Sequence, residues 1–197
     1  MPSHSSSKRR VVPRAGLSPE RVVHEAAQLV DEVGRERLTL SELAKRLGVA
    51  QPSLYKHVDG LHGLNRLLTI LALSEVGATM RRASTGQARE DAIGALASAY
   101  RTYALTHPGR YGYVMRAPTP GDAAWEAAAA EILSILDDVF IGYGITGANA
   151  VDAARFVRSV LHGFVSLELG GGFGLPQSAD TSFRRLVHAT NRALSDW

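Results

Sequence analysis

The stretch from Thr39 to Val58 constrains the fold of this 197-residue chain more than any other part of the sequence. Thr39 and Glu42 have the spacing of a capping box, in which each side chain binds the other residue's free backbone amide at a helix start. The residues that follow at helical spacing are Leu40, Leu43, Ala44 and Leu47. Gly48 comes next, and glycine accepts the positive φ that a tight turn requires. The pattern therefore predicts a short helix that ends in a tight turn.

A second short helix is expected from about Gln51 to His57, and Ala44 is small enough for the two helices to approach closely. The apolar residues that would hold this helix-turn-helix on the preceding helix are Leu43, Leu47, Val49, Leu54 and Val58. Amide, hydroxyl, cationic and imidazole groups on the outward positions suit phosphates and base edges. Those positions are Gln51, Ser53, Tyr55, Lys56 and His57. The pattern indicates duplex DNA as a partner.

The charge distribution favours the same partner. Up to Arg66 the sequence has 11 basic and 7 acidic residues, and the remainder of the 22 basic and 19 acidic residues is 11 and 12. The positive excess therefore lies in the first third of the chain, as expected of a segment that faces an anion. An ordinary helical bundle with a solvated basic face is the alternative. Here the capping box, the small crossing residue and the turn glycine coincide with the charge, which favours DNA binding.

The first sixteen residues are rich in Ser and Arg and show no periodicity, which predicts a disordered basic arm over residues 1–16. Two roles stay open for such an arm, insertion into a minor groove or simple solubilisation. No apolar stretch follows its basic residues, so the arm does not have the pattern of a secretory signal.

Composition is that of an ordinary globular protein from a reducing compartment. Hydrophobic residues make up 45% and charged residues 21% of the sequence, and there is no cysteine. The absence of cysteine excludes disulfides, thiolate metal sites and a cysteine nucleophile. Charged or polar residues interrupt every apolar run well short of the roughly 20 residues that span a bilayer. We therefore expect a cytoplasmic protein without a membrane segment.

Helical periodicity continues through the rest of the chain, and no alternating strand pattern of any length appears. The first helix is expected from Ser18-Pro19 to Gly34, and a fourth helix opens at Asp59. Further helices are expected at about residues 88–106, 109–116, 122–142, 149–169 and 180–196. We predict an all-α protein, with a DNA-binding domain over residues 17–66 and a second helical domain over residues 67–197.

The stretch Leu38–Val58 resembles the DNA-binding domain of the tetracycline-repressor (TetR) family of bacterial regulators, and the resemblance covers about residues 17–66. In that family three helices bind DNA, and a fourth links them to a helical ligand-binding and dimerisation domain. The resemblance implies that Thr39 and Tyr55 contact phosphates. It also implies that the residues at or near the bases are Gln51, Pro52, Ser53 and Lys56. Ser41 and His57 complete the expected DNA-contacting set, and His57 matches a histidine that the family often carries.

Two positions depart from the family pattern. Ala50 stands where family members often have a serine that caps the recognition helix, so Pro52 is expected to fix the first turn and Gln51 to cap it. Leu61 stands where many members place a lysine on a phosphate. The affinity for DNA is therefore expected to depend more than usual on Tyr55, Lys56 and the basic arm.

Two segments near the C-terminus carry more apolar surface than a single core-facing side needs. Apolar residues occur on more than one face of residues 149–169, and residues 180–196 add a second apolar stripe. Members of the TetR family dimerise through a four-helix bundle of their last two long helices, which implies a homodimer through these segments. A helix buried inside one protomer is the alternative. Gly163 in mid-helix suggests close helix–helix approach or room for a ligand.

The runs His107–Tyr111 and Leu161–Phe164 resemble the Trp/His-Gly motif of one C-terminal subgroup of this family. Aromatic residues gather in the same two-thirds of the chain, where the family fold implies a concave apolar pocket. We predict that the pocket is lined by Tyr103, Met115, Trp125 and His162. The expected effector is a small apolar or aromatic molecule.

No catalytic or metal-binding motif accompanies these features. None of the seven histidines has the spacing and acidic company of a zinc motif. The run Gly170–Gly174 follows a helix and lacks the ending of a phosphate loop, so it is interpreted as a linker. The acidic pairs Asp31-Glu32 and Asp137-Asp138 are interpreted as solvated helix faces. We expect no enzyme activity, no metal and no cofactor.

These features together predict a homodimeric, ligand-responsive transcriptional regulator. It would be a repressor that binds a near-palindromic DNA operator and is released by a small molecule. A sequence-tolerant architectural DNA-binding protein is the first alternative. A small-molecule-binding or enzymatic protein with a vestigial helix-turn-helix is the second.

Overall fold

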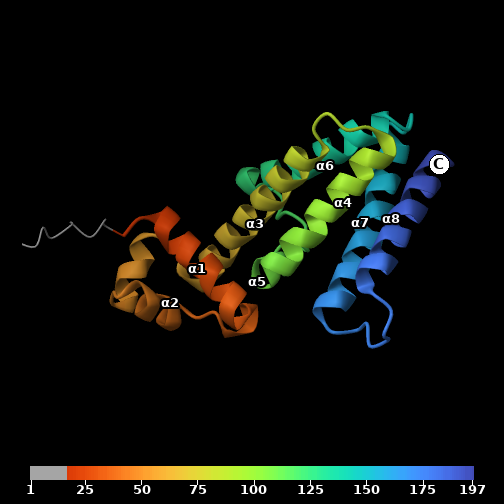
Figure 1. The fold of residues 1–197 in the computed structure, drawn as a ribbon. Coiled ribbons are helices and arrows are strands. Elements are labelled where there is room, and N and C mark those ends of the chain that lie inside the picture. Colours follow the sequence, from red (N-terminus) through yellow and green to blue (C-terminus); the bar gives the residue numbers. More distant parts are fainter. Residues whose placement is uncertain (1–16) are drawn as a thin grey trace, which may run out of the picture.

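The computed structural model describes residues 17–197, and all regular structure in this range is helical, which confirms the predicted all-α class. The predicted basic arm, residues 1–16, lies outside the described residues. The elements are α1 (Pro19–Val33), η1 (Arg35–Arg37), α2 (Leu40–Leu47), η2 (Gln51–Lys56), α3 (Gly60–Ser84), α4 (Arg89–Thr106), α5 (Pro108–Tyr111), α6 (Ala123–Ile141), α7 (Ala148–Leu169) and α8 (Ala179–Ser195). Figure 1 shows an elongated molecule with α1 and α2 at one end and α7 and α8 at the other.

The helix starts of the N-terminal part follow the sequence signals. The Ser18 side chain accepts a hydrogen bond from the Arg21 amide at 3.3 Å, and the Thr39 hydroxyl accepts one from the Glu42 amide at 3.1 Å. The return bond, in which the Thr39 amide would donate to the Glu42 carboxylate, is not formed within residues 17–197, so only half of the capping box is present. Gly48 ends α2 in the left-handed region, at φ 68° and ψ 35°.

The recognition segment is a six-residue 3₁₀ helix, η2, rather than an α-helix. Ala50 occupies its N-cap position and Gln51 is its first residue, so the prediction that Gln51 caps it is wrong. Pro52 lacks an amide hydrogen and fixes the first turn, and a segment this short has few i→i+4 bonds to gain. Tertiary packing holds it instead, because Leu54 is fully buried and Val58 nearly so.

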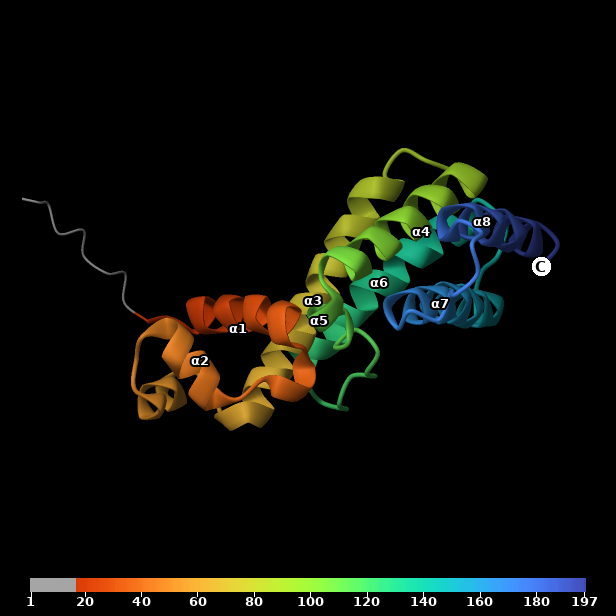
Figure 2. The ribbon, with the colours of Figure 1, turned by 60° about the horizontal axis from the view of Figure 1, so that its bottom comes forward.

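Helix α3 is the axis of the fold. It packs along most of its length against α4 and α6, and it also contacts α1. Figure 2 shows α3 running from the end that holds α1 and α2 into the larger helical part without a break. Gly77 lies at the α3–α6 contact, where an added Cβ would come within 3.5 Å of Ile132. One continuous helix therefore carries α1 and α2 at one end and the C-terminal helices at the other.

Arg66 and Arg101 form ion pairs with elements that are distant in sequence. Arg66 of α3 forms a bidentate pair with Asp122, which also caps α6 by accepting a bond from the Trp125 amide at 3.2 Å. Arg101 of α4 donates to Glu168 at the end of α7 at 2.7 Å and pairs with Asp180 of α8 at 2.7 Å. These contacts fix the ends of α6, α7 and α8 relative to α3 and α4.

The predicted helix at residues 109–116 is much shorter in the structure, because α5 ends at Tyr111. Tyr113 is almost fully buried, and its hydroxyl donates to Asn65 of α3 at 2.8 Å. The chain after Tyr111 forms a turn instead of continuing the helix, and in this turn the Tyr113 ring is buried against α3. The other predicted helices begin and end within one or two residues of the observed ones.

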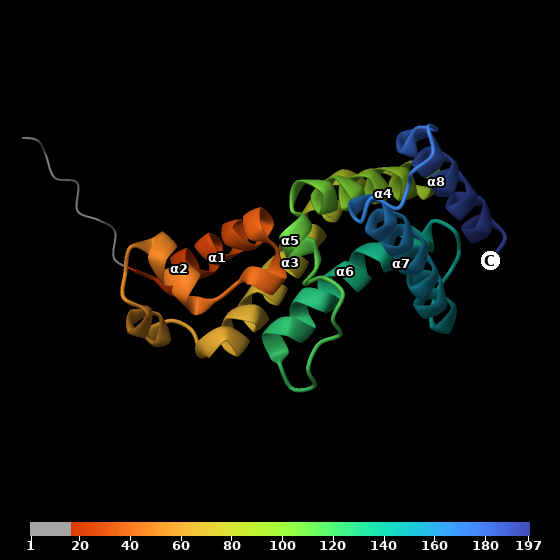
Figure 3. The same ribbon diagram turned by 90° about the horizontal axis from the view of Figure 1, so that it is seen from below.

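Helices α7 and α8 lie side by side at the end of the molecule farthest from α1 and α2, as Figure 3 shows. The inner side of α7 is buried against α4, α6 and α8 through Val157, Leu161, Phe164 and Val165. Leu167 and Val151 on the same helix are about half exposed, at 54% and 51%. Helix α7 therefore has apolar surface beyond the core of one protomer. None of the helices in residues 17–197 has the length and hydropathy needed to cross a bilayer.

Candidate nucleic-acid interface and ligand cavity

The residues predicted to contact DNA are accessible, while the apolar residues between them hold the motif together. Those exposed are Thr39, Ser41, Gln51, Pro52, Tyr55 and Lys56, and Ser53 and His57 are half-buried. Leu43, Leu54 and Val58 of the same stretch are buried in the core. The Thr39 hydroxyl accepts the Glu42 amide, so its own hydrogen stays available for a phosphate oxygen. The arrangement presents hydroxyl, amide and cationic groups on a rigid support, which suits duplex DNA.

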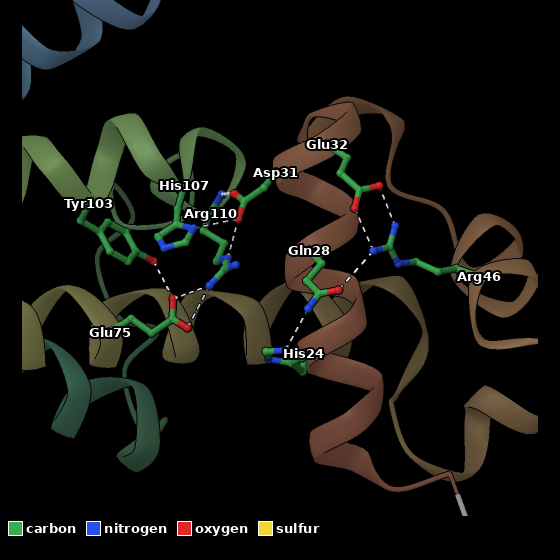
Figure 4. Close-up of polar contacts among 9 residues, drawn as sticks. All are labelled: His24, Gln28, Asp31, Glu32, Arg46, Glu75, Tyr103, His107 and Arg110. Carbon is green, nitrogen blue, oxygen red and sulfur yellow. Dashed lines mark hydrogen bonds and ion pairs between the residues drawn. The ribbon is translucent and has the colours of Figure 1, made fainter. Parts of the chain in front are cut away.

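Arg46 fixes α2 on α1. Its guanidinium donates to Glu32 at 2.6 and 2.8 Å, to Glu25 at 3.1 Å and to Gln28 at 3.2 Å, and Figure 4 shows the bonds to Glu32 and Gln28. The bonds that Arg46 donates to Glu32 and, to a lesser extent, to Glu25 raise the pKa of Arg46, and the bond to Glu32 lowers the pKa of Glu32. Arg46 therefore links α2 to three residues of α1.

A second polar cluster joins α1 to the larger helical part. We call it the Arg110 cluster, and its members are Asp31, Glu75, Tyr103, His107 and Arg110 (Figure 4). Arg110 donates to Asp31 of α1 from its backbone amide at 2.9 Å and from Nε at 2.7 Å. Its Nη1 lies 3.0 Å from both carboxylate oxygens of Glu75 on α3. The Tyr103 hydroxyl of α4 donates to Glu75 at 2.9 Å, and His107 lies 3.2 Å from Asp31.

Burial shapes the electrostatics of the Arg110 cluster. Burial alone would lower the pKa of Arg110, but the hydrogen bonds and charges of Glu75 and Asp31 outweigh it and raise the pKa. Burial, together with the Glu75 charge, raises the pKa of Tyr103 far above its ordinary value. Tyr103 is therefore a neutral hydrogen-bond donor, and Arg110 is a permanent cation shared between two carboxylates.

Gly109 brings α5 directly onto the backbone of α1. A Cβ at this position would lie 2.0 Å from the Val30 carbonyl oxygen and 2.7 Å from the Asp31 amide nitrogen. Only glycine permits this approach, because the obstructing atoms are backbone and cannot turn away. The interface between α5 and α1 is thus closely packed as well as hydrogen-bonded.

A cavity of about 380 Å³ lies among α3, α4, α6, α7 and the segment after α5. This volume lies within the range of small-molecule pockets, roughly 300–1,000 Å³. Its apolar lining comprises Leu73, Val76, Met80, Leu96, Val114, Ala117, Pro118, Ala129, Ile132, Leu133, Leu136, Ala150, Val151, Ala154, Val157 and Leu161. Its polar lining comprises Tyr100, Arg116, Asp137, Arg155 and Arg158.

The four residues predicted to line a pocket occupy other places, and the lining of this cavity includes none of them. Tyr103 belongs to the Arg110 cluster. Trp125 is buried, with its indole nitrogen unpartnered, at the start of α6, and the Met115 carbonyl accepts a bond from Arg158 at 3.2 Å. His162 lies 2.7 Å from the Tyr111 hydroxyl, and burial followed by the charge of Arg158 lowers its pKa.

The sequence offered little indication that acidic residues of α1 and α6 pair with distant arginines or line the cavity. Asp31 pairs with Arg110 and its side chain is only 14% exposed, so its interpretation as part of a solvated face is wrong. Glu32 pairs with Arg46 but is 56% exposed, as expected of a solvated face. Asp137 lines the cavity, and Asp138 lies 3.6 Å from Arg81 of α3. The spacing of Glu25, Gln28 and Glu32 on one side of α1 was the available hint for Arg46. No spacing rule connects Asp31 with Arg110, because their contact is purely tertiary.

Two family models match the chain. The model described as bacterial regulatory proteins, tetR family, matches residues 22–57, and the model described as tetracyclin repressor-like, C-terminal domain, matches residues 93–190. The chain belongs to the TetR family. This confirms the resemblance seen in residues 38–58 and extends it to the C-terminal part.

Relatives of this TetR protein are regulators. The HTH-type transcriptional regulator Rv0681 of Mycobacterium tuberculosis is 39% identical over 175 residues, which cover 86% of this chain and 78% of the relative. The tetracycline repressor class A of Escherichia coli is 30% identical over 161 residues, which cover 79% and 68% of the two chains. A TetR variant from Acinetobacter baumannii AYE, in complex with minocycline, shares the fold with a TM-score of 0.72 at 22% identity, covering 92% of this chain and 98% of that one.

This membership establishes the chain as a DNA-binding transcriptional regulator rather than an enzyme. In residues 17–197 there is also no group of three His, Cys, Asp or Glu side chains placed to hold a metal ion.

Proposed function

We propose that this TetR protein is a repressor whose DNA affinity is controlled by a small, largely apolar molecule in the cavity. The observation that carries the proposal is the position of residues 108–118. Gly109 and Arg110 contact α1, and Val114, Arg116, Ala117 and Pro118 line the cavity. One short segment thus touches both the cavity and the first helix of the DNA-binding part.

The contacts described above give a route from the cavity to the helix-turn-helix. Movement of α5 acts on Asp31 and Val30 of α1, and α1 carries α2 through Arg46. A ligand changes DNA affinity only by binding one arrangement better than the other. A molecule that fits the cavity better when residues 114–118 are displaced would therefore favour a helix-turn-helix position unsuited to the operator.

The proposal includes a homodimer through α7 and α8. On α7 a stripe of spacing i, i+4, i+7 and i+11 is exposed or half-buried in one protomer: Phe156, Val160, Gly163 and Leu167. A Cβ at Gly163 would have nothing within 4 Å in the described residues, so this glycine leaves room for a second chain rather than for a neighbouring helix. Small exposed or half-buried residues on α8 extend the surface: Ser182, Ala189 and Ala193.

A symmetric dimer would place two recognition segments about 34–36 Å apart, one helical turn of DNA, and would read a near-palindromic operator. The proposed contacts are Thr39, Ser41, Gln51, Pro52, Ser53, Tyr55, Lys56 and His57. The repressor role and the effector are supported by two of the relatives, one named a tetracycline repressor and one bound to minocycline.

Selection of genomic DNA fragments on the purified protein, followed by gel shifts, tests the proposal. We expect a near-palindromic site bound at least about 10³-fold more tightly than random duplex at physiological salt. Deletion of the gene is expected to raise transcription from the promoter that carries this site. Equal binding to all duplexes, with a steep salt dependence, would instead identify a sequence-tolerant architectural protein.

A further inference from the structure

The lining of the cavity is mostly apolar, and its exposed charged residues carry a net positive charge. Its charged lining residues, all exposed, are Arg116, Asp137, Arg155 and Arg158. Arg155 is paired with Asp152 at 3.1 Å, although both side chains are largely exposed. Within residues 17–197, neither Arg116 nor Arg158 forms an ion pair with a carboxylate. Two guanidinium groups without a carboxylate partner therefore share the lining with one carboxylate, that of Asp137.

Arg158 is held in place without being neutralised. Its Nη2 donates to the backbone carbonyls of Val114 at 3.4 Å and Met115 at 3.2 Å, which are uncharged acceptors. These bonds engage one of the three guanidinium nitrogens and leave the N–H groups of the others without a partner in the described residues. A guanidinium fixed in this way loses little conformational freedom when it binds an anion, so it is preorganised.

The other polar group of the lining is already engaged. The Tyr100 hydroxyl lies 3.1 Å from the Tyr111 hydroxyl, which in turn lies 2.7 Å from Nδ1 of His162. The rest of the lining is aliphatic. A ligand that matches the site therefore needs an apolar body for the interior and one negative group for the arginines.

We infer that the effector of this cavity is an amphipathic carboxylate, with its apolar body among α3, α4, α6 and α7 and its carboxylate on Arg158 and Arg116. The inference rests on the proposed function in taking this cavity as the effector site. Arginine binds carboxylates through two parallel N–H···O bonds, which gives both strength and orientation. A neutral ligand would leave both guanidinium groups unpaired, and a cationic ligand would be repelled by them.

Isothermal titration of the full-length protein with decanoate, decan-1-ol and decylamine tests this ligand class. The three probes share one apolar body and differ only in the head group. We expect decanoate to bind at least about tenfold more tightly than decan-1-ol, and decylamine to bind most weakly. Equal affinity for acid and alcohol, tighter binding of the amine, or no binding of any straight-chain carboxylate from six to twelve carbons would each overturn the inference.

Variants of the protein test whether Arg158 and Arg116 cause the preference for the carboxylate over the alcohol. Arg158→Gln is expected to remove most of the acid-over-alcohol ratio while leaving the affinity for decan-1-ol unchanged, and Arg158→Lys to keep much of the ratio. Arg82→Gln removes the same charge from an exposed position of α3 outside the lining and should leave the ratio as in wild type. Ala129→Phe, which fills the cavity from α6, should weaken the acid and the alcohol together. A ratio that survives Arg158→Gln and Arg116→Gln combined would overturn the inference.

Operator binding is measured separately, which distinguishes the two proposals. Decanoate that binds with the expected preference but leaves the gel shift unchanged supports the ligand class and contradicts the proposed ligand control of DNA binding. An operator complex that forms and is released only by neutral or cationic molecules supports the proposed function and overturns the carboxylate inference.

Discussion

Arg110 and Asp31 are 79 residues apart in the chain and are joined by two hydrogen bonds, from the Arg110 backbone amide at 2.9 Å and from its Nε at 2.7 Å. Their side chains are only 10% and 14% exposed. The pair connects the first helix of the DNA-binding part to the short helix α5, whose continuation lines the cavity. It is therefore both a stabilising contact and a direct connection between the DNA-binding part and the segment that lines the cavity.

Replacing Arg110 with methionine is expected to destabilise the protein by about 3 kcal/mol, because Asp31 and Glu75 would lose their shared buried cation. Urea denaturation followed by circular dichroism measures the change. Arg155→Met removes one member of a surface pair, 76% and 64% exposed, and should cost less than about 1 kcal/mol. Equal losses of unfolding free energy in the two variants would show that the Arg110 cluster contributes no more to stability than an exposed ion pair.

Gly109→Ala is expected to lower the melting temperature and to reduce the effect of a cavity ligand on the affinity for DNA. Its Cβ would lie 2.0 Å from the Val30 carbonyl oxygen, so α5 must move away from α1, at a cost of about 1–3 kcal/mol. Gly94→Ala is the matched control, because Gly94 lies within α4 and its Cβ would have nothing within 4 Å. That change should stabilise the helix by up to about 1 kcal/mol. The prediction fails if both changes shift the melting temperature in the same direction.

Lys56→Ala is expected to weaken operator binding and to reduce the slope of log K against log salt concentration by about 1, as the loss of one phosphate contact would. Lys56 is exposed, so the free energy of unfolding should change by less than about 0.5 kcal/mol. Fluorescence anisotropy with labelled operator at several salt concentrations measures the slope. Arg82→Ala serves as the charge-matched control and should leave the slope unchanged.

His162 predicts a pH dependence of stability. Burial and the charge of Arg158 lower its pKa from the ordinary 6.5, so the unfolded chain takes up the proton more readily than the folded one. Stability should therefore fall as the pH drops below about 6.5, until the folded state is protonated as well. Arginine partners lower the pKa of Glu32 and Asp122, which keeps both carboxylates ionised above pH 5. Denaturation of wild type and His162→Gln between pH 7.5 and 5 should show a weaker fall in the variant, and parallel curves would contradict the assignment.

Leu167→Glu is expected to convert the proposed dimer into monomers without loss of helix content. Leu167 is 54% exposed in one protomer, so the charge is tolerated there but not in an apolar interface. Analytical ultracentrifugation measures the state of assembly. Leu105→Glu, on α4 and 44% exposed, is the control and should stay dimeric. A dimeric Leu167→Glu variant would place the interface elsewhere.

The sequence by itself determined the features that depend on neighbouring residues. Ser18 and Thr39 mark helix starts because the side-chain oxygen of each accepts a hydrogen bond from an amide three residues ahead. Gly48 marks a turn because the turn requires a positive φ at that one residue. Helical spacing placed Leu43, Leu54 and Val58 in the core for the same reason. Local geometry is encoded locally, and the all-α class and the DNA-binding motif followed from it.

Only the tertiary structure decided which distant groups meet. The contacts of Asp31 with Arg110, of Gly109 with Val30, and of Arg158 with the segment after α5 depend on how α1, α5 and α7 are placed by α3 and α4. The cavity arises in the same way, from helices that no short-range rule brings together, and none of the aromatic residues expected to line it does so. Packing of whole helices sets these positions, because each depends on the summed burial of many side chains and not on the spacing of a few.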